Sequence, residues 1–268
     1  MVSCVVPHYY RSFVFPLLAT YTESGVSGGI YQKNFFSVSH ACYRYIIFSY
    51  PAFSYDIFNY TFTARTVVLY HKNPYIVIPL QFWTIDPWVS FMRWIHLPSA
   101  YTPLWILLTI PAYVFGFGSV LLTLWNIKLI VAASYVITTV LIGKILDIMD
   151  PKKAVLGMAL FALNPLVLIE TLVSSHNDMV MMAMATGAFY LYVSRRRWSS
   201  YIALSLSVAA KLMTVFLFPL YWLGWKREYV LGAMTIGFVL VLFQREVLPW
   251  YFVRLAPYIP LLPRNRPL

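Results

Sequence analysis

The sequence predicts an all-α fold, a polytopic bundle of transmembrane helices with an amphipathic loop on its outer side. The chain of 268 residues is 60% hydrophobic and its mean hydropathy is +0.70. Soluble domains are usually about half apolar by a similar count. Several stretches approach or exceed the roughly 20 apolar residues that a helix needs to cross a bilayer. We therefore expect a multi-pass integral membrane protein.

The basic residues mark the connections between the apolar stretches. Twenty Lys and Arg against nine Asp and Glu give a net charge of +11. In a soluble protein this excess would suggest nucleic-acid binding, but here the cations cluster in short connections, as the positive-inside rule describes. We expect membrane lipids as partners and no nucleic acid. Two cysteines, Cys4 and Cys42, provide neither a disulfide framework nor a metal-ligand spacing.

The N-terminal part of the chain, residues 1–101, predicts no strong membrane span. Residues 1–34 lack the compact apolar core and cleavage site of a signal peptide, and we separate them from a single domain over residues 35–268. Residues 35–53 predict a weak first span. Residues 54–101 are aromatic and amphipathic, and too polar to cross lipid, so they predict an outer loop of short helices lying on the membrane surface.

Four apolar stretches follow the outer loop. Residues 102–117 contain Pro and Gly, so we expect a re-entrant or tilted segment at the outer surface, whereas residues 120–142 predict a full span. Residues 154–173 and 179–193 predict two more spans. Lys152-Lys153 precedes the first of these and Arg195-Arg196-Arg197 follows the second, and both basic clusters should be cytoplasmic. The polar island between the two spans, Ser174-Ser175-His176-Asn177-Asp178, should therefore face outward.

The stretch over residues 201–223 contains a lysine far from either end. Irregular backbone and a lysine at membrane depth are tolerated where they line a cavity, so we expect two half-helices that break at Lys211. Residues 229–244 then cross outward and bring Pro249-Trp250-Tyr251 to the outer face.

Four carboxylates map to the outer side: Asp56, Asp86, Glu170 and Asp178. The other acidic residues have basic neighbours and are expected to form solvated ion pairs. Asp56 is either a first-turn or capping carboxylate, which the helix dipole favours, or a general base at the membrane surface. Both interpretations stay open.

The polar island and Lys211 leave similar alternatives. Asn177 or Asp178 could cap the helix that follows, but a cap explains one polar residue and not three. Two adjacent potential ligands without an HExxH pattern are too few to define a metal site. Lys211 is either a snorkelling residue or a ligand for a phosphate. His96 is either an interfacial anchor or a substrate contact.

The order of several short motifs resembles that of a known enzyme group. They are Ser54-Tyr55-Asp56-Ile57-Phe58-Asn59-Tyr60, Asn73-Pro74-Tyr75, Tyr101-Thr102-Pro103-Leu104-Trp105, Asn164-Pro165-Leu166-Val167-Leu168-Ile169-Glu170 with His176-Asn177-Asp178, then Lys211, and Pro249-Trp250-Tyr251. Across roughly residues 50–255 the chain resembles the GT-C superfamily of membrane glycosyltransferases. It is most similar to the prokaryotic mannosyltransferase-like branch that uses polyprenyl-phosphate sugars.

The resemblance implies transfer of a hexose, with mannose expected, from a polyprenyl-phosphate donor to an acceptor hydroxyl on a glycan, a lipid or a protein. It places the site at the extracytoplasmic face of a prokaryotic cell membrane. Asp56 would be the general base and Lys211 would meet the donor phosphate. The implied substrate-binding residues are Glu170, His176, Asn177, Asp178, Lys211, His96, Trp250 and Tyr251.

Other implications of the resemblance concern cofactors and completeness. No cofactor is firmly implied and no metal ligand is assigned, although a divalent cation stays an open alternative. Relatives usually continue for several more spans, so we expect a domain that is incomplete at its C-terminus.

The alternatives to a glycosyltransferase are a transporter or flippase of lipid-linked sugars, which would share the polar cavity and the broken helix, and an inactive truncated family member.

Overall fold

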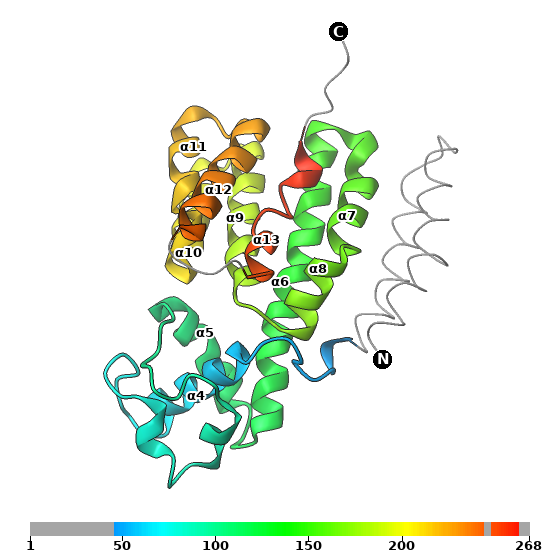
Figure 1. Ribbon diagram of the computed structural model, residues 1–268. Coiled ribbons are helices and arrows are strands. Elements are labelled where there is room, and N and C mark those ends of the chain that lie inside the picture. The colour runs from blue at the N-terminus through cyan, green and yellow to red at the C-terminus, as the bar shows by residue number, and fades with distance from the viewer. Residues whose placement is uncertain (1–45, 244–247, 263–268) are drawn as a thin grey trace.

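The computed structural model describes residues 46–243 and 248–262, and these residues form helices and loops without a strand. The long helix α6 (Val120–Met149) runs through the middle of the molecule (Figure 1). Helix α7 (Ala154–Ala162) lies on one side of it, and α9 (Asp178–Val193), α10 (Arg197–Ala210) and α12 (Arg227–Leu242) lie on the other. The predicted all-α class is confirmed for the described part of the chain. Residues 1–34 and most of the predicted span over residues 35–53 lie outside it.

The predicted outer loop contains short helices, as expected. They are α4 (Asp56–Val68), η2 (Pro79–Phe82) and η3 (Pro87–Phe91). They gather with α5 (Pro103–Val114) at one end of α6 (Figure 1). Pro103 occupies the first turn of α5, where its missing N–H leaves no helical bond unmade.

Asp86, one of the four carboxylates predicted to lie on the outer side, holds this group of short helices together. Its Oδ2 accepts hydrogen bonds from Arg65 Nε at 2.5 Å and from the Tyr70 hydroxyl at 2.8 Å. Its Oδ1 accepts a bond from the backbone N–H of Trp88 at 3.0 Å, which caps η3. The Arg65 guanidinium also lies 4.2 Å from the centre of the Trp88 ring. These bonds account for Asp86 without any role in substrate binding.

Helix α6 extends beyond the predicted span. Its 30 residues rise about 45 Å, at 1.5 Å per residue, and it ends at Asp150 before Pro151. Among the described residues, it is the one helix long and apolar enough to cross a bilayer by itself. Helices α5 and α9 are apolar but shorter. The structure thus contains one clear membrane-span candidate.

Residues 154–173 were predicted as one span, and the structure bends them by 54°. The break separates α7 from α8 (Pro165–Leu168), which continues into a π-helical turn, η5 (Ile169–Val173). Pro165 lacks an N–H and disfavours a helical conformation at Asn164, which is extended. The Asn164 side chain then accepts a hydrogen bond from the N–H of Leu166 at 2.9 Å and starts a new helix. These residues therefore form a second span only if α7 and the segment of α8 and η5 cross the membrane together.

The predicted break at Lys211 is present. Lys211 is extended between α10 and η6 (Leu212–Leu217), and α11 (Phe218–Leu223) follows. Helix α11 ends at Gly224, whose φ of +92° suits a residue without a Cβ. Two short helices, α13 (Trp250–Val253) and η7 (Ile259–Leu261), return along α6, α7 and α9.

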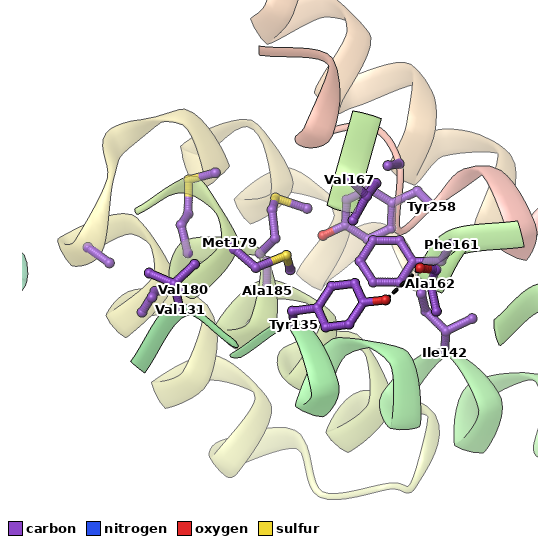
Figure 2. Close-up of a cluster of buried hydrophobic side chains, with 14 of the residues drawn as sticks. Val131, Tyr135, Ile142, Phe161, Ala162, Val167, Met179, Val180, Ala185 and Tyr258 are labelled. Carbon is purple, nitrogen blue, oxygen red and sulfur yellow. Dashed lines mark hydrogen bonds between the residues drawn. The ribbon is translucent and has the colours of Figure 1, made fainter. Parts of the chain in front are cut away.

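The core lies where α6, α7 and α9 meet (Figure 2). The Tyr135 and Phe161 rings stack with their centres 5.8 Å apart, and the Tyr135 hydroxyl donates a hydrogen bond to the carbonyl of Ala162. Gly157 lets α7 approach α6 closely, because a Cβ at this position would come within 2.3 Å of Leu146 Cδ1. This packed layer supports the broken helix and the island beyond it.

Candidate functional site

A cavity of about 750 Å³ opens between the short helices of the outer loop and the helical bundle. Its size falls within the range of small-molecule sites, roughly 300–1,000 Å³. The charged residues on its wall are Asp56, Arg93, Lys211 and Arg254. The aromatic ones are Phe53, Tyr55, Trp94, Tyr101, Trp250 and Tyr251. A wall with three cations, one carboxylate and several aromatic faces suits a ligand that carries both an anion and a sugar.

Asp56 faces the cavity from the first turn of α4. Its side chain is 20% exposed and makes no cap bond, because Tyr55 occupies the N-cap position. Oδ1 accepts a hydrogen bond of 3.4 Å from the Tyr101 hydroxyl, and Oδ2 lies 3.3 Å from His176 Nδ1. Burial and the nearby Asp56 charge raise the pKa of Tyr101, so its phenol keeps the proton that it donates. The carboxylate is thus oriented from behind and open toward the cavity.

His176 lies between two carboxylates. Its side chain is 2% exposed, with Nδ1 toward Asp56 and Nε2 at 3.3 Å from Glu170 Oε2. The Trp250 ring stacks on the imidazole with centres 4.3 Å apart and planes 22° apart. Burial alone would lower the pKa of His176, but the bonds and charges of Asp56 and Glu170, with the charge of Asp178, raise it overall.

Asp178 is buried and binds two cations. Its Oδ2 accepts a hydrogen bond from Lys211 Nζ at 2.6 Å, and its Oδ1 accepts one from Arg254 Nε at 2.5 Å. Lys211 Nζ also donates to Asn177 Oδ1 at 3.0 Å. Asn177 stands at the N-cap of α9 but makes no side-chain cap bond there. The side chains of Asn177 and Asp178 therefore hold Lys211 and Arg254 at the cavity wall.

The backbone of the island is irregular, which explains how three polar residues turn inward. The π-helical turn η5 adds a residue to the last turn before Ser174, whose N–H bonds to the carbonyl of Ile169 at 2.9 Å. Ser175 has a φ of +59°, a conformation that few residues other than glycine adopt. π-Helical turns and left-handed residues are both enriched at functional sites.

Comparison with known proteins identifies the family. Residues 45–227 match the model of a family described as alpha-(1->6)-mannopyranosyltransferase, N-terminal domain. The chain belongs to this family. No curated protein and no solved structure matches the chain. The membership confirms the mannosyltransferase-like resemblance, and with it glycosyl transfer as the activity of the family.

The structure of this mannosyltransferase family member places all but one of the predicted site residues at the cavity or directly behind its wall. Five of them line the cavity: Asp56, Asn177, Lys211, Trp250 and Tyr251. Three lie buried behind its wall: Glu170, His176 and Asp178. His96 is exposed on the outer loop and is not among the lining residues. His176 and Asp178 contact wall residues, and Glu170 contacts His176.

Arg254 is a site residue of this family member that the sequence analysis missed. It is 4% exposed, pairs with Asp178 and lies with its guanidinium carbon 4.4 Å from the centre of the Tyr251 ring. A signal was present, because an arginine in the otherwise apolar segment 250–258 resembles Lys211 in its own apolar stretch. Trp250 and Arg254 both lie C-terminal to the residues that match the family.

No metal site is evident in the described part of the mannosyltransferase chain. Residues 46–243 and 248–262 contain no group of three or more His, Cys, Asp or Glu side chains placed to hold a metal ion. Asp56, His176 and Glu170 do lie together, but each imidazole nitrogen lies 3.3 Å from a carboxylate oxygen. This arrangement suits a proton on each nitrogen better than a metal on either.

Proposed function

We propose that this chain transfers mannose from a polyprenyl-phosphate donor to an acceptor hydroxyl, within a multi-pass GT-C type membrane domain and at its extracytoplasmic face. Family membership supports the sugar and the reaction class. The observation that carries the rest is that Asp56, Lys211 and Arg254 line the wall of one cavity. A carboxylate can take a proton there while the cations meet a phosphate.

The reaction follows from these positions. Asp56 accepts the proton of the acceptor hydroxyl as its oxygen attacks the anomeric carbon of the donor. The bond between that carbon and the phosphate oxygen breaks, and its electron pair leaves with the lipid phosphate. Lys211 and Arg254 stabilise the developing negative charge on the phosphate. Attack from the face opposite the leaving phosphate inverts the configuration at the anomeric carbon. Trp250 and Tyr251 offer faces on which a sugar ring can lie.

The lipid and the membrane face are proposed on separate grounds. The cavity wall includes apolar and aromatic side chains of the outer loop, among them Phe53, Trp94 and Leu97, which are well exposed. Such residues suit the membrane interface and the first part of a lipid chain. The basic clusters around α7 and α9 orient the island outward by the positive-inside rule.

The test is transfer of labelled mannose from a polyprenyl-phosphate donor in membranes that contain the protein. Asp56→Asn keeps the size of the side chain but removes the base, and we expect a loss of about 100-fold or more in kcat. Asp147→Asn, at an exposed position near the far end of α6, is the matched control and should transfer at the wild-type rate.

Three outcomes would change the proposal. A wild-type rate for Asp56→Asn would remove Asp56 as the base. Movement of the donor between leaflets without transfer would favour the transporter or flippase alternative. Transfer that a chelator abolishes would bring a divalent cation into the mechanism, whereas unchanged transfer would remove that alternative.

A further inference from the structure

Behind the cavity wall lies an ion group whose inner members, Glu170, His176 and Asp178, do not line the cavity. Three carboxylates, Asp56, Glu170 and Asp178, lie around His176. Asp178 already has two strong partners, Lys211 and Arg254. Among the described residues, neither Asp56 nor Glu170 pairs with a lysine or an arginine. His176 is the group that faces both of them.

The net charge of this group depends on whether the His176 imidazole carries one proton or two. Two cations and three carboxylates give a net charge of −1, and a doubly protonated His176 brings it to zero. A neutral imidazole has one lone pair, which would point at either Asp56 or Glu170 across 3.3 Å. Buried charges without compensation are costly, so the arrangement favours the imidazolium.

We propose that His176 is a protonated positioning residue that holds the Asp56 carboxylate toward the cavity, and that Glu170 and the Trp250 ring hold His176 in place. His176 acts through Asp56 and does not bind the sugar. Glu170 is 5% exposed and separated from the cavity by the imidazole that it contacts. This inference rests on the proposed role of Asp56 as the base.

The surroundings of His176 determine the expected pH dependence. Asp56 faces it from α4, Glu170 from η5 and Asp178 from α9, while α13 contributes the uncharged Trp250 ring. A histidine whose folded pKa is raised holds its proton through the ordinary value of about 6.5 and loses it only at higher pH. Asp56 should therefore lose its orientation, and kcat should fall, as the pH rises through the raised pKa.

The protonation state can be measured without any substrate. The chain has five histidines, so ¹⁵N-histidine spectra of the purified protein in detergent are simple, and His176→Asn identifies the signal of His176. We expect an imidazolium signal at pH 7 that titrates above the ordinary histidine value of about 6.5. In Glu170→Gln, which keeps the size of the side chain, the same signal should titrate at lower pH. A neutral imidazole at pH 6 in the wild type would overturn the inference.

Transfer kinetics test the positioning role. In Glu170→Gln we expect the alkaline decline of kcat to shift to lower pH, in step with the His176 signal, and KM for the donor to stay within about twofold. In His176→Asn we expect kcat to fall about 10-fold or more and the alkaline decline to disappear. His71→Asn is the control, because His71 is exposed with φ of +51°, a conformation that asparagine tolerates. Its pH profile should match the wild type.

The outcomes distinguish a failure of the positioning role of His176 from a failure of the proposed function. A raised KM with an unchanged pH profile in either variant would show that the residue contacts substrate, and would overturn the positioning role. A kcat decline that does not follow the His176 signal would do the same. If the wild type transfers no mannose, the proposed function fails, and the spectra alone then decide whether the buried imidazolium exists. If His176→Asn does not fold, Glu170→Gln carries both measurements.

Discussion

At the residue scale, the carboxylates of Asp56 and Asp178 belong to the same site but differ in exposure and in their partners. Asp56 is partly exposed and has weak, long contacts, which leaves it free to accept a proton. Asp178 is fully buried and bound by two cations at short distances, which leaves it no room for chemistry. Asn177 and Asp178 therefore hold Lys211 and Arg254 at the cavity wall, and the proposed base comes from another helix, α4.

The buried role of Asp178 leads to a prediction about stability. Asp178→Asn keeps the shape of the side chain but leaves the buried Arg254 and the partly exposed Lys211 without their anion. Breaking a buried ion pair in this way costs about 3–5 kcal/mol. We expect a clear fall in the thermal unfolding midpoint of the protein in detergent.

Asp150→Asn is the control for this measurement. Asp150 pairs with Lys153 at 2.7 Å, but both side chains are partly exposed, and surface pairs contribute little. Its unfolding midpoint should stay close to that of the wild type. Equal midpoints for the two variants would mean that the network around Asp178 does not stabilise the fold.

At the element scale, most helices follow from the sequence, and the exceptions have identifiable causes. The runs of apolar residues predicted α6 and α9, and Lys211 in mid-run predicted a break. The bend at Asn164-Pro165 was not predicted, although proline is the strongest local signal for one, because the apolar run hides it. The π-helical turn that follows has no sequence pattern of its own, and it is what turns Glu170 toward His176.

The close contact between α6 and α7 gives a prediction at this scale. A side chain at Gly157 would meet Leu146, with Pro260 and Ile142 beside it. These neighbours are themselves packed, so Gly157→Leu should lower the free energy of unfolding by about 1–3 kcal/mol through overpacking. Gly232 lies in α12 with no atom within 4 Å of an added Cβ, and Gly232→Leu should leave stability equal or higher. A destabilisation of Gly232→Leu as large as that of Gly157→Leu would contradict the packing explanation.

At the scale of the whole molecule, the site is assembled from segments far apart in the chain. The sequence predicted Asp56, Asn177, Lys211, Trp250 and Tyr251 at one place by charge topology and by family order, and the structure brings them to one cavity. The sequence did not distinguish residues that line the cavity from residues that are buried behind it. Burial depends on how the segments pack and not on residue type. Arg254 was missed for the same reason, since its partner Asp178 lies 76 residues away.

Lys128 joins two of these segments through the central helix. It is 1% exposed in α6, and its Nζ donates hydrogen bonds to the carbonyl of Ser49 at 2.6 Å and to that of Val173 at 3.2 Å. Ser49 lies seven residues before Asp56, and Val173 lies three residues before His176. One ammonium group thus ties together the backbone segments that precede Asp56, the proposed base, and His176, its proposed positioning residue.

This tie predicts that a substitution outside the cavity will weaken the reaction. Lys128→Met keeps the length of the side chain but leaves two carbonyls without their donor, at a cost of about 1–3 kcal/mol for each buried group left unsatisfied. We expect a lower unfolding midpoint and a several-fold lower kcat for mannose transfer, with KM little changed, because Asp56 and His176 are no longer held in register. Lys144→Met makes the same change at an exposed position of α6 and should alter neither quantity. If Lys128→Met lost stability but kept the wild-type kcat, the alignment of Asp56 with His176 would have to come from their own contacts and not from α6.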